Sequence, residues 1–375
     1  MFLAMVRVLQ IMGGLNRGGL ETFVMNIYRA IDKTKIQFDF LVNSRGDYAE
    51  EIESLGGHIF LSPARNKGYR KYKKDLNCFF KKNSHHYVAC HVHVSSLSSI
   101  LPIECAEKYH IPVRILHAHS SSISKTVNKR WLHLLFHYIH KFKVRKVATH
   151  YFGCSQKALD WLYCSTGVRR KAELIKNGIA VSDYIFNSRI SSEVRRELGF
   201  SDNDIVLGHV GRFIPLKNHK FIVDVFKELH KQNENSKLLL IGEGETEETI
   251  KQQVSQYNLT EHVRFMGVRS DVNVLLQAVD CFVMPSWFEG MPVALIEAQA
   301  SGCYVVASDT ISKDSKLTDD FVFLSITQEA DLWANTILKG VVNRTKPNNE
   351  LLIKQAGFDS HSTAIMLSNV YLNRF

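Results

Sequence analysis

Two glutamates stand eight positions apart in the stretch MPSWFEGMPVALIEAQASG, which runs from Met284 to Gly302. Glu289 precedes a Gly-Met-Pro turn, and Glu297 follows in an apolar segment. Carboxylates in such surroundings cost free energy unless a partner binds them. Pro292 is typical of the first turn of a helix and Gly302 of its end, so we expect a helix with Glu297 in its second turn. The pair can accept hydrogen bonds from ligand hydroxyls, or it can be a capping glutamate and a surface glutamate.

Two cations in the stretch GRFIPLKN can bind an anionic ligand. Arg212 and Lys217 follow a buried strand and precede a helix, which places both at the carboxyl end of a strand. An arginine can bind a diphosphate through two parallel hydrogen bonds, and a lysine adds a point charge. Together they can neutralise a departing nucleoside diphosphate without a metal ion. The alternative is two ordinary surface cations.

A glycine-rich loop, GGLNRGGLE, connects the first predicted strand to the first predicted helix. Backbone N–H groups at Gly18 and Gly19 and the helix N-terminus after them suit a phosphate, although a simple tight turn is an equal alternative. The spacing is not G-x-G-x-x-G, and the second strand ends FLVNS with no acidic residue to bind ribose. A nicotinamide dinucleotide site is therefore disfavoured.

The elements that position these groups alternate between strands and helices. In the first half we predict strands at 6–12, 36–43, 86–94, 112–120 and 147–155, and helices at 20–31, 131–142 and 157–165. In the second half we predict strands at 205–212, 237–245, 262–267, 281–286 and 304–309, and helices at 219–233, 246–259, 270–279 and 292–301. Such alternation indicates doubly wound parallel sheets with ligands at the carboxyl ends of the strands.

The polar segment 178–204 interrupts the alternation and predicts a domain boundary. We expect an α/β fold of two Rossmann-like domains, residues 1–180 and 181–375, facing each other across a cleft that is the default ligand site. The last helix, about 360–375, closes the chain and is expected to pack back on the N-terminal domain.

Composition and charge narrow the partners. The 375 residues are 45% hydrophobic and 22% charged, as in folded globular proteins. Residues 1–200 hold 31 Lys+Arg and 15 Asp+Glu, whereas residues 201–375 hold 16 and 22. The basic half predicts an anionic partner, but no nucleic-acid-binding motif accompanies the charge. Seven scattered cysteines favour a reducing cytoplasm, and no apolar stretch is long enough to span a bilayer.

Two basic segments of the first half, 65–82 and 128–146, contain many aromatic residues. In the second, Trp131, Leu135, Tyr138 and Phe142 share one helical stripe. Such a helix can lie on an anionic membrane surface, or it can turn this stripe to the core and its cations to solvent. Metal ligation at two histidine groups, His133–His137–His140 and Cys90–His91–His93, lacks acidic or cysteine partners at suitable spacing, and we expect neither metal nor cofactor.

Together these motifs carry a resemblance to a known family. FEGMPVALIE resembles the Glu-x7-Glu signature of the retaining glycosyltransferase family 4, which has the two-domain GT-B fold. NRGGLE, VGRFIPLKN, FMGVRSDV and EAQASG follow in the order and spacing seen there, over essentially the whole chain. The chain is most similar to the bacterial exopolysaccharide and capsule enzymes. One departure is Tyr304, where the family usually has proline; it concerns packing more than chemistry.

The resemblance implies roles for individual residues. Arg212 and Lys217 are expected to bind the donor diphosphate, Glu297 the nucleotide ribose and Glu289 the transferred sugar. The remaining implied donor contacts are Gly290, Met291, Pro292 and Val293 near the sugar, Val268 and Arg269 along the base, and Gly18 and Gly19 at the phosphates. Family members also have a histidine near the sugar at the end of an N-domain strand. Here His117 and His119 are both candidates.

The implied activity is transfer of a hexose from a nucleotide-sugar, most simply a UDP-sugar, to a glycan or lipid-diphosphate-linked saccharide. Substitution proceeds on one face of the anomeric carbon with retention, and charge builds on the departing diphosphate. The protein is expected in the cytoplasm, peripherally at the inner membrane face. Alternatives are a catalytically silent GT-B scaffold of a polysaccharide assembly complex and a nucleotide-sugar epimerase. The sugar, the choice between UDP and GDP, the acceptor and the oligomeric state stay open.

Overall fold

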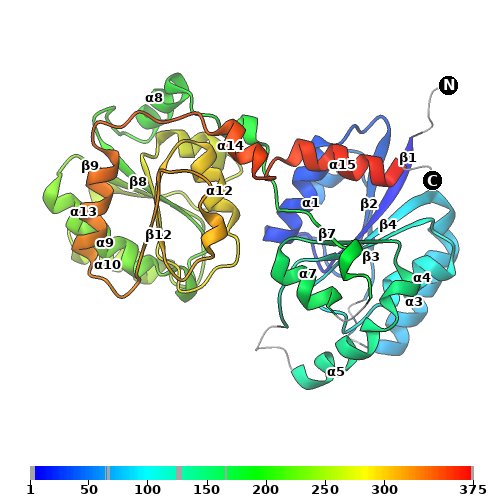
Figure 1. Cartoon of the computed structure of the whole chain (residues 1–375). Coiled ribbons are helices and arrows are strands. Elements are labelled where there is room, and N and C mark those ends of the chain that lie inside the picture. Colours follow the sequence, from blue (N-terminus) through cyan, green and yellow to red (C-terminus); the bar gives the residue numbers. More distant parts are fainter. Residues whose placement is uncertain (1–4, 64, 66–67, 124–128, 165–166, 373–375) are drawn as a thin grey trace. The chain divides into compact units, whose positions relative to one another are not determined.

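The computed structural model describes residues 5–63, 65, 68–123, 129–164 and 167–372. Parts of the predicted elements therefore lie outside the described residues: positions 1–4, 66–67 and 128, Ser165, and 373–375 of the last helix. The chain divides into two compact units (Figure 1). Unit 1 is built from the chain up to Gly178 together with the segment from Ser360 onward, and unit 2 is Ile179–Asp359.

Unit 1 contains a parallel sheet in the order β3-β2-β1-β4-β5-β6-β7. Its strands are β1 (Val6–Ile11), β2 (Ile36–Val42), β3 (Ile59–Leu61), β4 (Tyr87–Val94), β5 (Val113–Ala118), β6 (His150–Gly153) and β7 (Glu173–Leu174). Its helices are α1 (Gly19–Ala30), α2 (Ala49–Ser54), α3 (Tyr69–Asn83), α4 (Leu101–Lys108), α5 (Arg130–Lys141), α6 (Val144–Val147), α7 (Gln156–Tyr163) and α15 (Ser360–Leu372). The order reverses between β1 and β4, which is the topological switch point where such sheets bind ligands.

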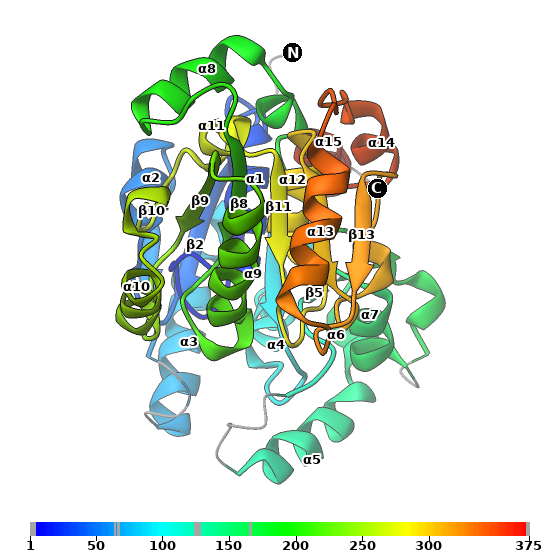
Figure 2. The same cartoon turned by 90° about the vertical axis from the view of Figure 1, so that its left-hand side faces the viewer.

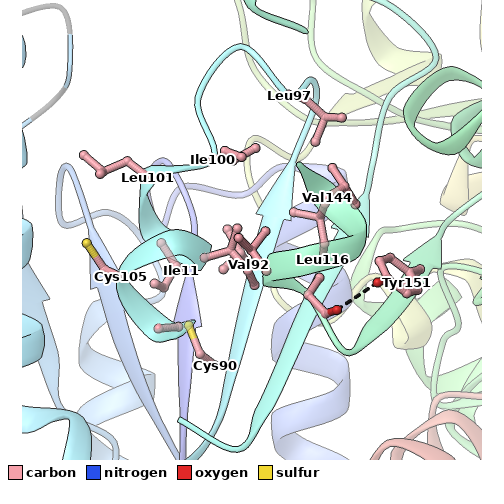
Figure 3. Packing of buried hydrophobic residues seen from close by; sticks show 14 of the residues in the cluster. Ile11, Cys90, Val92, Leu97, Ile100, Leu101, Cys105, Leu116, Val144 and Tyr151 are labelled. Atoms are coloured by element: carbon pink, nitrogen blue, oxygen red, sulfur yellow. Dashed lines mark hydrogen bonds between the residues drawn. The ribbon is translucent and has the colours of Figure 1, made fainter. Parts of the chain in front are cut away.

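Alternating side chains along each strand supply two hydrophobic cores, one on each face of this sheet. On one face Cys90 and Val92 of β4 pack with residues of α3, α4, α6 and α7. Figure 3 shows part of this core, including Cys105 of α4 and Val144 of α6. Nearby, the hydroxyl of Tyr151 donates a hydrogen bond to the Ala148 carbonyl at 2.8 Å. On the other face α1, α2 and α15 cover the sheet, with Leu367 and Tyr371 of α15 in the core. The last helix thus completes a layer of unit 1.

Unit 2 contains a parallel sheet in the order β10-β9-β8-β11-β12-β13. Its strands are β8 (Ile205–Val210), β9 (Ser236–Ile241), β10 (Val263–Phe265), β11 (Cys281–Met284), β12 (Tyr304–Ser308) and β13 (Phe321–Leu324). Its helices are α8 (Ser188–Glu197), α9 (His219–Gln232), α10 (Glu247–Gln256), α11 (Val272–Leu275), α12 (Val293–Ala300), α13 (Ala330–Val341) and α14 (Glu350–Gln355). Figure 2 shows α9 and α13 in front of this sheet, where α9, α10 and α13 pack on one face and α8, α11 and α12 on the other. Here the order reverses between β8 and β11.

The predicted fold class of two doubly wound α/β domains, with a C-terminal helix closing the chain, is confirmed. Several elements were missed, because short strands at a sheet edge such as β3 and β7 carry little alternation. Helix α8 lies inside the polar segment 178–204, where we predicted only a boundary; it buries a narrow stripe with Val194 against the sheet. The unusual Tyr304 packs its ring over Gly340 of α13, where an added Cβ atom would lie 2.1 Å from the ring.

The apolar stripe of α5 faces outward, so the core-facing interpretation of this helix is wrong. Trp131 is 66% exposed, Tyr138 55% and Phe142 75%. The inward face is polar instead: His137 is fully buried, stacks on Trp161 at 4.0 Å, and accepts the Leu97 N–H at 3.0 Å. In the described ranges no helix is long and apolar enough to cross a bilayer.

Candidate functional site

The charged residues singled out in the second half gather at the carboxyl edge of the unit 2 sheet. Arg212 follows β8, and Glu289 follows β11, its neighbour in the sheet. Because the strand order reverses between these two strands, their loops diverge and leave an open crevice in this fold class. The sequence motifs therefore meet at the place where doubly wound sheets bind ligands.

The structure brings Lys217 and Glu289 into an ion pair. Lys217 lies at the end of a 3₁₀ turn, Pro215–Lys217, that leads from β8 into α9. Its Nζ atom is 2.6 Å from Oε1 of Glu289, and each side chain is only 16% exposed. A cation and a carboxylate that hold each other in a poorly solvated place are pre-positioned to share a ligand that carries both a phosphate and hydroxyl groups.

Arg212 lies on the same loop but is exposed. None of the described residues forms an ion pair with it, in contrast to Lys217. Its guanidinium is therefore available to an anionic ligand at the carboxyl end of β8.

Two glycines allow the loops after β8 and β9 to touch. Gly242 has φ +135°, a conformation that residues with side chains rarely adopt. A Cβ atom added to Gly242 would lie 2.1 Å from the Gly211 carbonyl oxygen. The backbone of the Arg212 loop is thus held by direct contact with the loop after β9. This close approach fixes the position of the Arg212 backbone.

Glu297 lies in α12, which begins at Val293 after the N-cap Pro292 and ends before Gly302, whose φ is +70°. The predicted helix is confirmed, with proline at the cap and not inside the first turn. The Tyr184 hydroxyl donates a hydrogen bond to Glu297 Oε1 at 2.8 Å. Burial raises the pKa of Glu297, and the Tyr184 hydrogen bond only partly offsets this. A second acceptor oxygen is left for a ligand hydroxyl.

The loop before α12 carries the remaining predicted contacts of this region. Gly290 is exposed, and Met291 and Val293 are partly buried. The described backbone N–H groups at this helix N-terminus point out of α12, as they do at the start of any helix, and suit an anion. The exposed rings of Trp287 and Phe288 stand immediately before Glu289, and neither residue was predicted as a donor contact.

Val268 and Arg269 follow β10, two strands away from β8. Val268 is 49% exposed. The Arg269 guanidinium makes a bidentate ion pair with Asp271, at 2.8 and 2.7 Å, which raises the pKa of Arg269. This pairing fixes the loop geometry, so Arg269 has a structural partner that the sequence reasoning did not foresee.

Two buried histidines lie beneath the Lys217 loop and were also missed. His209 on β8 donates a hydrogen bond from Nδ1 to the Val283 carbonyl at 2.8 Å, because a carbonyl oxygen can only accept. His219 at the start of α9 stacks on Phe213 at 4.0 Å. Burial, together with a smaller effect of the nearby Lys217 charge, lowers the pKa of both histidines, that of His219 to about 4. Because both imidazoles are neutral, they add no charge beneath the loop. The positive charge of Lys217 itself can then act on an anionic ligand.

In unit 1 the glycine loop and the two candidate histidines lie on neighbouring elements. Gly18 is the N-cap of α1, and Gly19 is its first residue. His117 lies near the end of β5, and His119 follows that strand. Both rings contact Phe23 of α1, with ring centroids 5.3 Å and 5.6 Å apart. The structure thus brings both histidines, and not one of them, to the carboxyl end of β5.

The two histidine groups considered for metal ligation differ from expectation. Cys90 packs in the opposite core from His91 and His93, because neighbours on a strand face opposite sides. The ring nitrogens of His91, His93 and His117 do lie within 4.8 Å of one another. However, the ring nitrogens of His91 bond to Tyr371 and His117, and those of His93 to His119 and Gln10. On α5, His133 contacts Arg65 and His140 the Leu97 carbonyl.

Comparison with known proteins identifies relatives over the whole chain. The family profile "Glycosyl transferases group 1" matches residues 191–356, nearly all of unit 2. EpsF of Bacillus subtilis (strain 168), which is named a glycosyltransferase, is 32% identical over 97% of this chain and 96% of its own. The capsular polysaccharide biosynthesis glycosyltransferase CapH of Staphylococcus aureus is 26% identical over 99% of both chains.

A third relative and a solved structure extend the comparison to donors. The Escherichia coli UDP-Gal:alpha-D-GlcNAc-diphosphoundecaprenol alpha-1,3-galactosyltransferase is 23% identical over 90% of this chain and 87% of its own. The structure of HepE from Anabaena in complex with UDP and glucose is 18% identical and has a TM-score of 0.72, covering 98% of this chain and 100% of HepE. This likeness is one of fold, and it confirms the expected GT-B class of two Rossmann-like domains.

Proposed function

The chain belongs to the group 1 glycosyl transferases, and from this premise we propose that it transfers a hexose from a UDP-sugar to a glycan or lipid-diphosphate-linked saccharide. That it is a glycosyltransferase of bacterial polysaccharide biosynthesis follows from its relatives. The observation that carries the finer proposal is the Lys217–Glu289 ion pair beside Arg212 at the switch point of unit 2. UDP is the nucleotide bound by HepE and named for the E. coli relative, whose acceptor is lipid-linked.

In this proposal each charged group has one task. Arg212 and Lys217 neutralise the departing diphosphate, whose charge grows in the transition state, and Glu297 accepts hydrogen bonds from the ribose. Glu289 accepts hydrogen bonds from the transferred sugar. Because its carboxylate already holds Lys217 at 2.6 Å, it serves better as a hydroxyl acceptor than as a covalent nucleophile. The retaining mechanism of family 4 fits this set, since the acceptor hydroxyl attacks from the face of the leaving group.

The binding steps proposed here require no metal ion. Two side-chain cations and the N-terminus of α12 supply the positive potential that a divalent ion supplies elsewhere. In this proposal Gly290 to Val293 contact the sugar, Val268 and Arg269 the base, and Gly18 and Gly19 the phosphates. His117 and His119 lie near the sugar.

Calorimetry with UDP and GDP in the presence of EDTA tests the donor site. We expect metal-free binding of UDP by the wild type and its loss in Glu297→Ala. Glu234→Ala is the matched control, because Glu234 is exposed on a loop at the other end of the unit 2 sheet. A folded wild-type protein that binds neither nucleotide contradicts the proposal and favours the silent scaffold.

The acceptor side of the proposal includes an anionic membrane surface at α5. Its outward apolar stripe, Trp131, Leu135, Tyr138 and Phe142, is accompanied by cations that are exposed: Lys129, Arg130, Lys143, Arg145 and Lys146. A cavity of about 760 Å³ opens beside this helix, lined by α5 and α4 residues that include Leu132, Phe136 and Leu101. Exposed aromatic side chains next to cations are typical of segments that bind membrane interfaces. The proposed location is the cytoplasmic face of the membrane.

Vesicle sedimentation tests this surface. We expect binding to vesicles with phosphatidylglycerol, weaker binding to neutral phosphatidylcholine, and loss of binding in Trp131→Ser/Phe142→Ser. The control Leu351→Ser/Ile365→Ser removes two side chains that are each 66% exposed elsewhere. Equal binding by both double variants, or tighter binding of an RNA oligomer than of anionic vesicles, contradicts the proposal.

A further inference from the structure

Six polar side chains form a continuous chain of hydrogen bonds through the core of unit 1. The chain runs His119–His93–Gln10–Tyr371–His91–His117 and draws on β1, β4, β5 and α15. His119 Nε2 lies 2.9 Å from His93 Nδ1, and His93 Nε2 lies 2.9 Å from Gln10 Oε1. Gln10 Nε2 lies 3.4 Å from Tyr371 Oη. Tyr371 Oη lies 2.7 Å from His91 Nδ1, and His91 Nε2 lies 3.1 Å from His117 Nδ1.

Burial keeps the four imidazoles of this network neutral. It lowers the pKa of His91, His93 and His117 well below the ordinary value and that of His119 to about 3. A neutral imidazole has one N–H donor and one acceptor nitrogen. The hydrogen bond made by one nitrogen therefore determines what the other nitrogen can do.

The amide of Gln10 gives the network a direction. Its oxygen faces His93, so His93 carries its proton on Nε2 and accepts at Nδ1. His119 must then donate from Nε2, which leaves the Nδ1 atom of His119 without a proton.

The opposite branch runs the other way. The amide nitrogen of Gln10 donates to Tyr371 Oη, whose own proton goes to Nδ1 of His91. His91 then donates from Nε2 to Nδ1 of His117, so the remaining proton of His117 is on Nε2.

The two ends of the network are the two atoms left without a partner. Nδ1 of His119 and Nε2 of His117 are buried and have no hydrogen-bond partner among the described residues, so a ligand hydroxyl reaches them only when the side chains that cover them move. Their rings lie 4.2 Å apart between centroids. One end offers a bare acceptor and the other a free N–H donor, which is the complement of a hydroxyl group that donates and accepts at once.

We propose that Gln10 and Tyr371 are positioning residues, which fix the tautomers of His119 and His117 so that the pair presents one acceptor and one donor to a saccharide hydroxyl. The identity of the ligand rests on the proposed function, whereas the tautomers do not. Tyr371 takes part although it belongs to the last helix of the chain, far in sequence from both histidines.

Nitrogen NMR of the ¹⁵N-histidine-labelled full chain tests the proposal directly, because the two tautomers give distinct ring-nitrogen signals. Spectra of His117→Asn and His119→Asn assign the two residues. In the wild type we expect His119 protonated at Nε2 and His117 at Nε2. In Gln10→Met, His93 loses its acceptor and donates from Nδ1 to His119, so His119 switches to the Nδ1–H form.

Gln37→Met is the matched control, because Gln37 is a buried glutamine of the same sheet whose partner is Tyr28; there both tautomers stay unchanged. In Tyr371→Phe we expect His119 unchanged and His117 distributed between both forms. A wild-type His119 protonated at Nδ1, or an unaltered His119 in Gln10→Met, overturns the proposal.

Binding measured on the same samples separates this inference from the donor-site proposal. Gln10→Met is expected to bind UDP within about twofold of the wild type, since UDP carries no transferred sugar, and to turn over a UDP-sugar at least tenfold more slowly. If no variant binds UDP, the donor site is wrong, yet the tautomer result stands by itself. If Gln10→Met switches His119 without slowing turnover, the role assigned to the pair is wrong.

Discussion

The carboxyl group of Glu297 accepts a hydrogen bond from Tyr184 in surroundings that raise its pKa. A raised pKa in the folded state means that ionised Glu297 destabilises the fold. Conversely, the neutral acid contributes stability to the fold. That contribution is complete below the unfolded-state pKa of the group and is lost as the pH rises through its folded-state pKa. Glu297 therefore occupies a position where a neutral side chain is better for stability, which supports the proposed binding role.

Glu297→Gln should therefore separate binding from stability. We expect a higher free energy of unfolding than the wild type at pH 7.5 and no difference at pH 4, together with roughly tenfold weaker UDP binding, because a hydrogen bond to a charged group is lost. Urea denaturation at the two pH values and calorimetry check this. A variant that loses stability at pH 7.5 contradicts the sign of the pKa shift.

Substitutions of Lys217 and Arg212 should differ in their effect on thermal stability. Lys217→Met leaves the Glu289 carboxylate without its partner at 2.6 Å, and we expect turnover to fall by about 10²–10³, as when one preorganised transition-state donor is removed. Arg212→Met should lower turnover similarly without lowering the melting temperature, because Arg212 is exposed. Steady-state kinetics and thermal melts compare the two. A Lys217→Met enzyme with normal turnover removes this residue from the leaving-group site.

At the scale of elements, the loops after β8 and β9 depend on Gly242. A side chain there would need φ +135° and would meet the Gly211 carbonyl at 2.1 Å. We expect Gly242→Ala to lower the free energy of unfolding by more than about 1 kcal/mol, since both strain and overlap act. Gly13→Ala is the control, because nothing lies within 4 Å of that position. Urea denaturation gives both values, and equal values contradict the argument.

Buried strands and amphipathic helices were predictable from sequence because their periodicity is strong. The motif loops were predictable because each follows a buried parallel strand, which places Arg212, Lys217 and Glu289 on one edge. Contacts that depend on long-range packing were not predictable. The Glu297–Tyr184 hydrogen bond joins residues 113 positions apart, and the outward stripe of α5 has the same period as an inward one. The spacing of His91, His93, His117 and His119 at alternate strand positions was a usable signal for their shared face.

At the scale of the whole molecule, acid sensitivity follows from its buried histidines. Burial lowers the pKa of His137 and His219 to about 4 and that of His119 to about 3, and lowers that of His91, His93, His117 and His209 well below the ordinary value. A lowered folded-state pKa gives stability that is present above the unfolded-state pKa near 6.5 and lost as the pH falls. Five of these seven histidines belong to unit 1.

We therefore expect unit 1 to unfold before unit 2 as the pH falls from 6.5 toward 4.5. Each buried neutral histidine lowers the free energy of unfolding by about 1.4 kcal/mol per pH unit in this range. A few of them together therefore offset a typical folding free energy of about 5–15 kcal/mol. Fluorescence of variants that retain only Trp161 in unit 1 or only Trp333 in unit 2 reports each transition. Coincident transitions, or an earlier loss of the Trp333 signal, contradict the expectation.

The return of the chain to unit 1 at α15 has a consequence for how the protein folds during translation. Unit 2 is one continuous stretch, Ile179–Asp359, whereas unit 1 lacks a covering helix until Ser360–Leu372 has been made. The part of the protein that is translated second can therefore finish folding first. Until translation reaches Tyr371, the nascent first domain keeps an uncovered apolar face and an incomplete hydrogen-bond network.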